Sequence, residues 1–228
     1  MKKSVLLFLC LIVGFASVAR ADRATERRKL ISRVETCEAI LQEFMGRPET
    51  AIPPAVWARA RAVVIVNQLK AGFLFGVQDG WGVMMVKRAD GTWSIPVLVS
   101  AAEASLGLQV GVNTVEKIYI ITDDATPKLM FKSRFEVGVD ARAVAGPHVA
   151  EKQKDSKAYL NTPVLVYTKK LGLYAGATVK TGYISRDDSD NQLLYNTQYE
   201  MPELLYSNWV QPIPQVLPLM RMVQAYAP

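Results

Sequence analysis

The sequence is poor in the residues that build catalytic and metal sites. It contains one histidine and two cysteines among its 228 residues. So few ligands cannot assemble a His/Cys metal cluster, and no G-x-S-x-G element accompanies His148, which follows Gly146-Pro147 as a surface turn residue would. We therefore expect no metal, no cofactor and no enzymatic activity.

A concentrated excess of cations is also lacking. The formal net charge of +6 falls to +3 if residues 1–21 are removed, because they carry three basic residues and no acid. Nucleic-acid binding requires clustered Lys and Arg, so we expect no nucleic acid partner. Glycine-rich phosphate loops are missing too, since the glycines between Lys70 and Arg88 match neither the Walker nor the dinucleotide spacing.

Residues 1–21 have the composition of a secretory signal peptide. Two lysines precede the apolar run SVLLFLCLIVGFASV, and the segment closes with Ala-Arg-Ala. The run is shorter than the roughly 20 residues of a spanning helix, so we expect cleavage after Ala21 and export to the periplasm or outer envelope, or secretion. Only Cys37 then remains, which excludes an intrachain disulfide, and residues 22–228 are expected to form a single domain.

The first segment after this leader has a helical period. Apolar residues recur at steps of four and three, and this predicts an amphipathic helix that ends near Gly46 and Pro48. Two prolines ahead of AVWARA predict a second, short helix over Pro54–Ala60. The apolar stripe consists of Leu30, Val34, Cys37, Leu41 and Phe44.

From Ala62 the period changes to two, which is typical of strands. The segment 105–113 alternates most clearly, and an Asp-Gly turn over Ala89–Thr92 predicts a hairpin. About eight strands joined by short turns predict a curved, partly closed, mostly antiparallel sheet. The other strand segments are AVVIVN, WGVMMVKR, WSIPVLVS, KIYIITD, RFEVGVDA, PVLVYTKK and LYAGATVKTGYIS.

Helices are expected again after Asp124, after Asp190 and over Gln215–Ala227, which makes the fold class α+β. The polar segment 149–159 reads as a mobile loop. The acidic run Asp187, Asp188 and Asp190 lacks the glycine and the terminal glutamate of a calcium loop. We therefore expect Ser189 or Asp190 to cap the following helix, and Asp123-Asp124 to act similarly.

Glycines within the strand segments form a second pattern. Glycine inside a strand marks a bulge, a bend or the close approach of another backbone. This favours a structural role in tight curvature over a ligand groove. The predicted structural glycines are Gly72, Gly76, Gly80, Gly82, Gly107, Gly111, Gly138, Gly146 and Gly176.

Several ordered blocks between Ile52 and Tyr195 resemble the SYLF family of lipid-binding domains. They are Lys-Ala-Gly at 70–72, Asp-Gly-Thr-Trp at 90–93 with Pro96, LGLQVGV at 106–112, Gly146-Pro147 and LGLYAG at 171–176. Three departures are Arg-Ala-Val at 61–63, where Lys-Gly-Leu is usual, SAAEAS at 100–105 in place of a more glycine-rich segment, and Asn196 in place of a glycine. The resemblance implies a non-enzymatic module that binds membrane lipid, in eukaryotic relatives phosphoinositides and in some cases actin filaments, partly through a basic amphipathic N-terminal segment.

Basic residues lie just before the apolar stripe of the predicted first helix and beside its first members. Cations at a helix N-terminus oppose its dipole, whereas each can gain about 1 kcal/mol beside anionic head groups. We expect such contacts here, with Leu30 and Ile31 dipping into the interface. The alternative is a core-docking helix with a solvated charged start. The candidate lipid-binding residues are Arg23, Arg27, Arg28, Lys29 and Arg33, then Lys70 from the family motif and Lys169 and Lys180 beside the glycine-bearing strands.

These observations lead to two hypotheses. The first is an exported, non-enzymatic module that docks on anionic phospholipid membranes through the basic helix and the adjacent sheet surface. The second is a protein-interaction module of the bacterial envelope that has no lipid ligand. A vesicle-binding experiment separates the two hypotheses. Only the first predicts that the protein binds anionic vesicles and that added salt weakens this binding.

Overall fold

The computed structural model describes most of the chain. The backbone is described over residues 2–72, 75–106, 112–132, 134–146, 161–170, 173–174 and 182–228. Side chains are described over residues 22–69, 80–103, 114–132, 134–146, 161–169 and 182–228.

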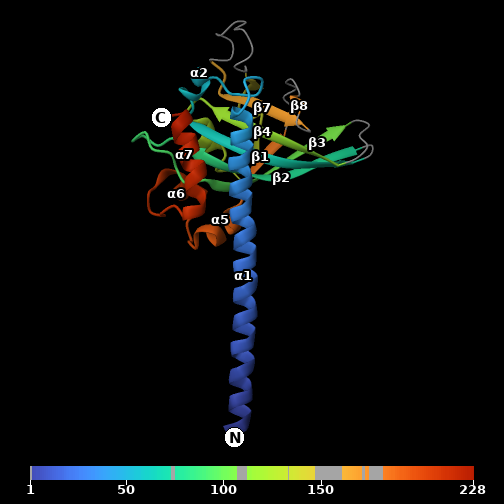
Figure 1. Cartoon of the computed structure of the whole chain (residues 1–228), viewed down its shortest axis with the longest axis vertical. Helices are drawn as coiled ribbons and strands as arrows, with labels where there is room; N and C mark the ends of the chain where they lie inside the picture. Colours follow the sequence, from blue (N-terminus) through green and yellow to red (C-terminus); the bar gives the residue numbers. More distant parts are fainter. Residues whose placement is uncertain are drawn as a thin grey trace.

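One sheet of nine strands dominates the described structure (Figure 1). Its order is β5-β9-β3-β2-β1-β4-β7-β6, with β8 paired to β7. Every pair is antiparallel except β6 with β7. The strands are β1 Ala62–Gly72, β2 Phe75–Val86, β3 Val97–Leu106, β4 Val112–Ile121, β5 Phe135–Glu136, β6 Ala143–Ala145, β7 Val164–Lys170, β8 Leu173–Tyr174 and β9 Gly182–Arg186.

The α+β class and the mostly antiparallel sheet are confirmed. The strand predicted over 105–113 differs in detail, because its two ends belong to β3 and β4 while residues 107–111 lie outside the described residues. The loop predicted over 149–159 also lies outside them. At the predicted hairpin, Gly91 has φ +84° and the Arg88 amide donates to the Thr92 carbonyl over 2.8 Å, as a tight turn requires.

The long helix α1 spans Lys2–Met45, and its C-terminal part packs on the sheet while its N-terminal part projects away from the body (Figure 1). It passes residue 21 without a break. The predicted apolar stripe is confirmed, because all five of its residues are at most 3% exposed. Burial of one face along a 3.6-residue period accounts for this.

Shorter helices follow the strands. They are α2 Pro54–Trp57, α3 Thr126–Leu129, α5 Asp188–Tyr195, α6 Met201–Tyr206, the 3₁₀ turn η1 Pro214–Val216 and α7 Leu217–Tyr226. Helices α5 and α7 contact α1, and α5 and α6 contact β3. Helix α2 is shorter than predicted, and α6 was not predicted; Glu200 and Glu203 form its capping box.

The expected cap of α5 is wrong by a few residues. Asp187, not Ser189 or Asp190, accepts the backbone N–H of Asp190, because the helix begins at Asp188 and the capping residue stands just ahead of it. At the other end Asn196 has φ 51° and ψ 53°. Asparagine tolerates this left-handed conformation, which explains how it can stand where the family usually has glycine.

Candidate functional site

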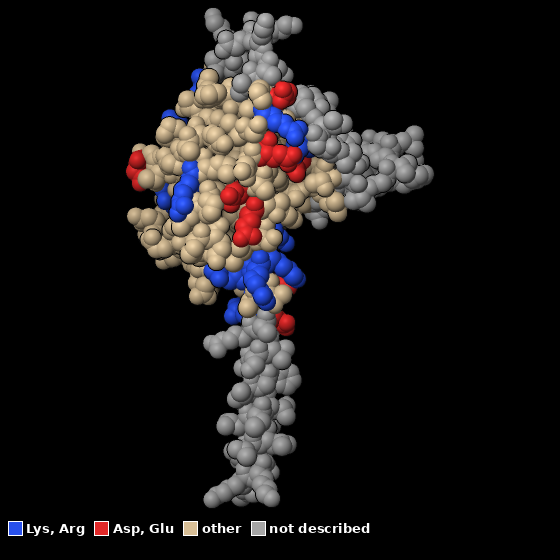
Figure 2. Space-filling model, viewed as in Figure 1, with Lys and Arg blue, Asp and Glu red and all other residues tan. Residues whose placement is uncertain are grey.

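The predicted basic cluster divides into exposed and anchored side chains. Arg23, Arg28 and Lys29 are exposed, and Figure 2 shows Lys and Arg gathered where α1 leaves the body. Arg27 instead donates from Nε to the Leu194 carbonyl over 2.8 Å. Arg33 donates from Nη1 to an Asp190 carboxylate oxygen over 2.7 Å. Helix α1 itself begins at Lys2, so these cations lie within the helix and not at its N-terminus. We call Arg23, Arg28 and Lys29 the basic start of α1 because they lie where the part of α1 that packs on the body begins.

Local contacts within the basic start stay on the helix itself. Lys29 pairs with Glu26 over 2.7 Å, with both side chains more than half exposed, and Arg28 donates to the Thr25 hydroxyl over 3.2 Å. Exposed i,i+3 pairs contribute little to stability. These cations are therefore free to meet an external anion at small cost.

Leu30 does not have the exposure that insertion into a membrane interface would require. It is 3% exposed and belongs to the core with Val34 and Cys37. Ile31 is partly buried against the same core. These side chains pack in the domain core instead of entering the membrane interface, because the core already removes their apolar surface from water.

A row of polar and aromatic side chains lies beneath α1 on the sheet. Register places the members opposite one another on β3, β2, β1, β4 and β7. Arg33 stands at one end and Glu43 at the other; ten helical residues rise about 15 Å, which matches three strand spacings of about 4.8 Å. The polar row consists of Ser100, Trp81, Asn67, Glu116 and Lys169.

Lys169 closes one end of the polar row. Its ammonium pairs with Glu43 on α1 and, over 3.2 Å, with Glu116 on β4, and its side chain is 9% exposed. Burial alone would lower the pKa of Lys169, but the hydrogen bonds and charges of the two glutamates outweigh burial and raise it. Lys169 thus joins α1 to the sheet and presents little free charge.

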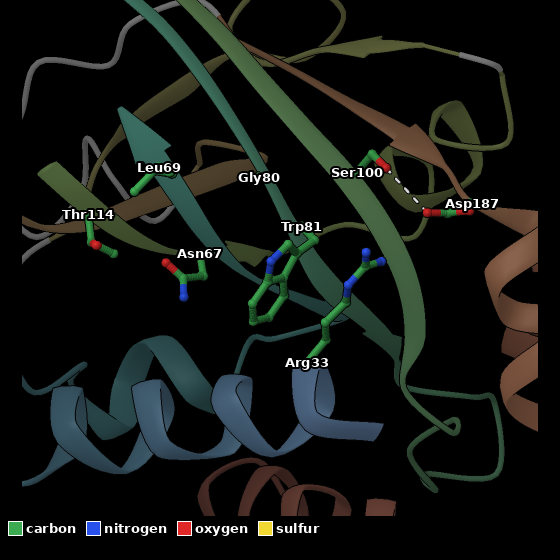
Figure 3. Close-up of a pocket in the computed structure, with 8 residues that line it drawn as sticks. All are labelled: Arg33, Asn67, Leu69, Gly80, Trp81, Ser100, Thr114 and Asp187. Atoms are coloured by element: carbon green, nitrogen blue, oxygen red, sulfur yellow. Dashed lines mark hydrogen bonds between the residues drawn. The ribbon is translucent and has the colours of Figure 1, made fainter. Parts of the chain in front are cut away.

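The opposite end of the polar row opens into a pocket of about 330 Å³ (Figure 3). The Arg33 guanidinium lies 5.9 Å from the Trp81 ring centre, within cation–π range. In Figure 3 Trp81 stands between Arg33 and Asn67, while Ser100 and Asp187 lie on the far side of Arg33. The pocket is lined by Arg33, Asn67, Leu69, Gly80, Trp81, Ser100, Thr114 and Asp187.

Acidic groups surround the Arg33 end of this pocket. The Ser100 hydroxyl is 3.3 Å from the Asp187 carboxylate. Burial and the neighbouring charge of Asp187 raise the pKa of Asp190, although Arg33 opposes the shift. The lining holds one cation, Arg33, and one carboxylate, Asp187, and Arg33 is also paired with Asp190 behind it. The described walls therefore carry no excess of positive charge.

Two of the predicted structural glycines stand where a side chain would meet the backbone of β1. A Cβ on Gly80 would lie 2.3 Å from the Asn67 carbonyl oxygen, and one on Gly82 would lie 2.2 Å from the Ile65 carbonyl oxygen. Only glycine permits such an approach between paired strands. Gly80 thereby also leaves the pocket floor open beside Trp81.

The structure describes only some of the other glycines and lysines that were predicted from the sequence. Gly72 pairs with Gly76 across β1 and β2, Gly138 has φ +85°, and a Cβ on Gly146 would overlap the Tyr167 ring. Lys70 lies in β1, but its side chain is outside the described residues. Also outside them are Gly107, Gly111, Gly176, Lys180 and His148.

Sequence reasoning missed the pocket. Asn67, Trp81 and Ser100 were predicted only as strand residues, and Thr114 lay between two predicted strands. A polar or bulky residue that interrupts an apolar strand was a usable signal. Within the described residues no group of three or more His, Cys, Asp or Glu could hold a metal ion. No helix in the described part is long and apolar enough to cross a membrane.

Comparison with known proteins identifies relatives across most of the chain. LAS seventeen-binding protein 3 of Saccharomyces cerevisiae is 31% identical over 208 residues, which are 88% of this chain and 45% of that protein. Protein YSC84 of the same yeast is 29% identical over 208 residues, 88% of this chain and 44% of that protein. The mouse SH3 domain-containing YSC84-like protein 1 is 24% identical over 189 residues, 80% of this chain and 56% of that protein.

The chain thus spans about half the length of these relatives. A family model described as Ysc84, Las17-binding protein actin regulator, matches residues 102–226. This match covers more than half of the chain, including β4, β7, β9 and the C-terminal helices. Together with the blocks between Ile52 and Tyr195, it shows that the chain belongs to the Ysc84 family of SYLF domains.

Proposed function

We propose that this SYLF domain docks on anionic phospholipid membranes without catalysing a reaction, as an exported protein. The observation that carries the proposal is the basic start of α1. Arg23, Arg28 and Lys29 are exposed on the stretch of helix that leaves the body. Each cation near an anionic surface contributes about 1 kcal/mol.

Docking through this surface is electrostatic in character. Leu30 is buried in the core and Ile31 is partly buried, so the described apolar side chains of this stretch add little insertion. Arg27 and Arg33 are held by Leu194 and Asp190. Without apolar insertion, binding should weaken strongly when salt screens the charges.

Vesicle flotation tests the proposal. Vesicles of phosphatidylglycerol and phosphatidylcholine should bind the protein at low salt, and pure phosphatidylcholine should not. Replacing the basic start with R23Q/R28Q/K29Q should reduce binding by about a hundredfold, because about three contacts of 1 kcal/mol each are removed.

A matched control removes the same charge elsewhere. Lys132, Arg142 and Arg221 are exposed on other elements, so K132Q/R142Q/R221Q should bind almost as well as the unchanged protein. Equal loss in both triple variants would show that only net charge matters. Salt-insensitive absence of binding to anionic vesicles would refute membrane docking.

A protein partner is the second candidate function. The relatives' names describe Las17 binding and SH3 domains, and this chain exposes an aromatic pair near its C-terminus. Tyr199 and Trp209 are 40% and 63% exposed, with ring centres 5.1 Å apart. Exposed Trp and Tyr are enriched among residues that dominate protein interfaces. Loss of a captured partner in Trp209→Ala, with vesicle binding unchanged, would favour this candidate.

A further inference from the structure

Polar side chains from three strands face one space in the pocket beside α1. Asn67, Thr114 and the Trp81 indole N–H line it or border it, and none of the three side chains hydrogen-bonds to a described residue. They come from three adjacent strands, β1, β4 and β2. Side chains that could pair with one another but do not are available to a ligand.

The shape of the pocket limits the size of that ligand. Its volume of about 330 Å³ lies near the lower end of ligand pockets, which run from roughly 300 to 1,000 Å³. The walls are mixed: Trp81 and the half-exposed Leu69 supply apolar surface, and an amide and two hydroxyls supply hydrogen bonds. A single ring with apolar C–H faces and a hydroxylated edge matches both kinds of wall.

The charges around this pocket make it unsuitable for an anionic ligand. The guanidinium of Arg33 is already paired with Asp190 over 2.7 Å and lies over Trp81. Asp187 contributes a carboxylate to the pocket lining itself. An entering phosphate or carboxylate would meet more negative than positive charge, which is unfavourable. A neutral ligand avoids this repulsion.

We infer that this pocket binds one neutral sugar ring, either a free sugar or the head group of a neutral glycolipid. The ring places a C–H face against Trp81 and its hydroxyls against Asn67 and Thr114, which lie on the neighbouring strands β1 and β4. This site is separate from the basic start of α1 and does not depend on membrane docking.

The test follows the indole N–H signal of Trp81 by NMR during titration with methyl glucoside, methyl galactoside and N-acetylglucosamine. The chain has four tryptophans, and Trp81→Phe identifies the signal. Trp93 already donates to the Ala227 carbonyl over 2.8 Å, so its signal serves as an internal reference. At least one sugar should produce a saturating shift at Trp81 alone.

Two substitutions then probe the hydrogen bonds. Asn67→Ala and Thr114→Val should each weaken the response by about three- to tenfold, the loss expected for one hydrogen bond. Thr168→Val makes the same replacement on the opposite face of the sheet and should change nothing. Spectra and thermal unfolding of each variant establish that it is folded.

Other outcomes overturn the inference. They are no shift with any of these sugars up to about 0.1 M, an undiminished shift in Asn67→Ala and Thr114→Val, or a response only to phosphate or choline. Neutral phosphatidylcholine vesicles with and without monoglucosyl diacylglycerol distinguish a head group from a free sugar. The variant R23Q/R28Q/K29Q should keep the sugar response even where it no longer docks on anionic vesicles, so the two proposals fail independently.

Discussion

The guanidinium of Arg33 donates to the carboxylate of Asp190 over 2.7 Å and so joins α1 to α5, two elements 157 residues apart. The two side chains are each about 30% exposed, whereas the Lys29–Glu26 pair on the same helix is more than half exposed. Because it is partly buried, the Arg33–Asp190 ion pair helps to hold α1 against α5. The Lys29–Glu26 pair remains a surface pair with little energetic weight.

Removing Arg33 should therefore destabilise the domain more than removing Lys29. Arg33→Gln is expected to lower the free energy of unfolding by about 1 kcal/mol, and Lys29→Gln by less than about 0.5 kcal/mol. Urea denaturation followed by circular dichroism measures both. Equal effects would show that the contact between α1 and α5 has no special weight.

The raised pKa of Asp190 predicts a pH dependence of stability. The unfolded carboxyl loses its proton near pH 3.8, and the folded one at higher pH, because burial and Asp187 disfavour its charge. The contribution of Asp190 is therefore fully present below about pH 3.8 and declines as pH rises through the folded pKa. Asp190→Asn should flatten this decline relative to the unchanged protein in denaturation series between acidic and neutral pH. An identical slope in both proteins would contradict the assignment.

Asn191 anchors α5 to β3 through buried hydrogen bonds. Its amide donates to the Leu98 carbonyl over 2.9 Å, and its oxygen accepts the Leu98 N–H over 2.7 Å. The side chain is 0% exposed. Asn191→Ala should cost about 2–4 kcal/mol, because buried backbone groups lose their partners. Gln192→Ala, on the same helix and partly exposed, should cost much less in the same thermal unfolding experiment.

Gly82 leaves no room for a side chain between β2 and β1. A Cβ there would lie 2.2 Å from the Ile65 carbonyl oxygen, which belongs to the backbone and cannot swing aside. Gly82→Ala should lower stability by about 3 kcal/mol. Gly91→Ala faces only its positive φ in open space and should cost about 1 kcal/mol. The reverse order of melting temperatures would argue against close strand approach.

Lys117 and Glu103 form a buried ion pair on the sheet face opposite α1, with side-chain exposures of 10% and 2%. Lys117→Met should destabilise by about 3–5 kcal/mol, because the buried glutamate loses its ion pair with the ammonium group of Lys117. The double variant K117M/E103L should recover much of this loss. Chemical denaturation of both variants measures the difference. A double variant as unstable as the single one would show that the pair is not mutually dependent.

The pattern of apolar residues carried much of the fold. Apolar residues that recur at steps of four and three over Leu30–Phe44 form a single stripe on one face of a helix. Such a stripe must be buried, and all five of its residues are buried. Period-two segments from Ala62 likewise located most strands. Helix α6 was not predicted, because six residues are too few to establish a 3.6-residue period of apolar positions. Its capping box was nevertheless present in the sequence.

Local sequence determined where helices and strands form and that cations gather ahead of the apolar stripe, because these properties depend on near neighbours. Only the tertiary structure decided which cations remain free: Lys29 and Arg33 are four residues apart on one helix, yet a carboxylate from α5 reaches Arg33 alone. The same holds for the pocket. Asn67, Trp81 and Ser100 share a row only because β1, β2 and β3 pair in this register, and register depends on packing between distant segments.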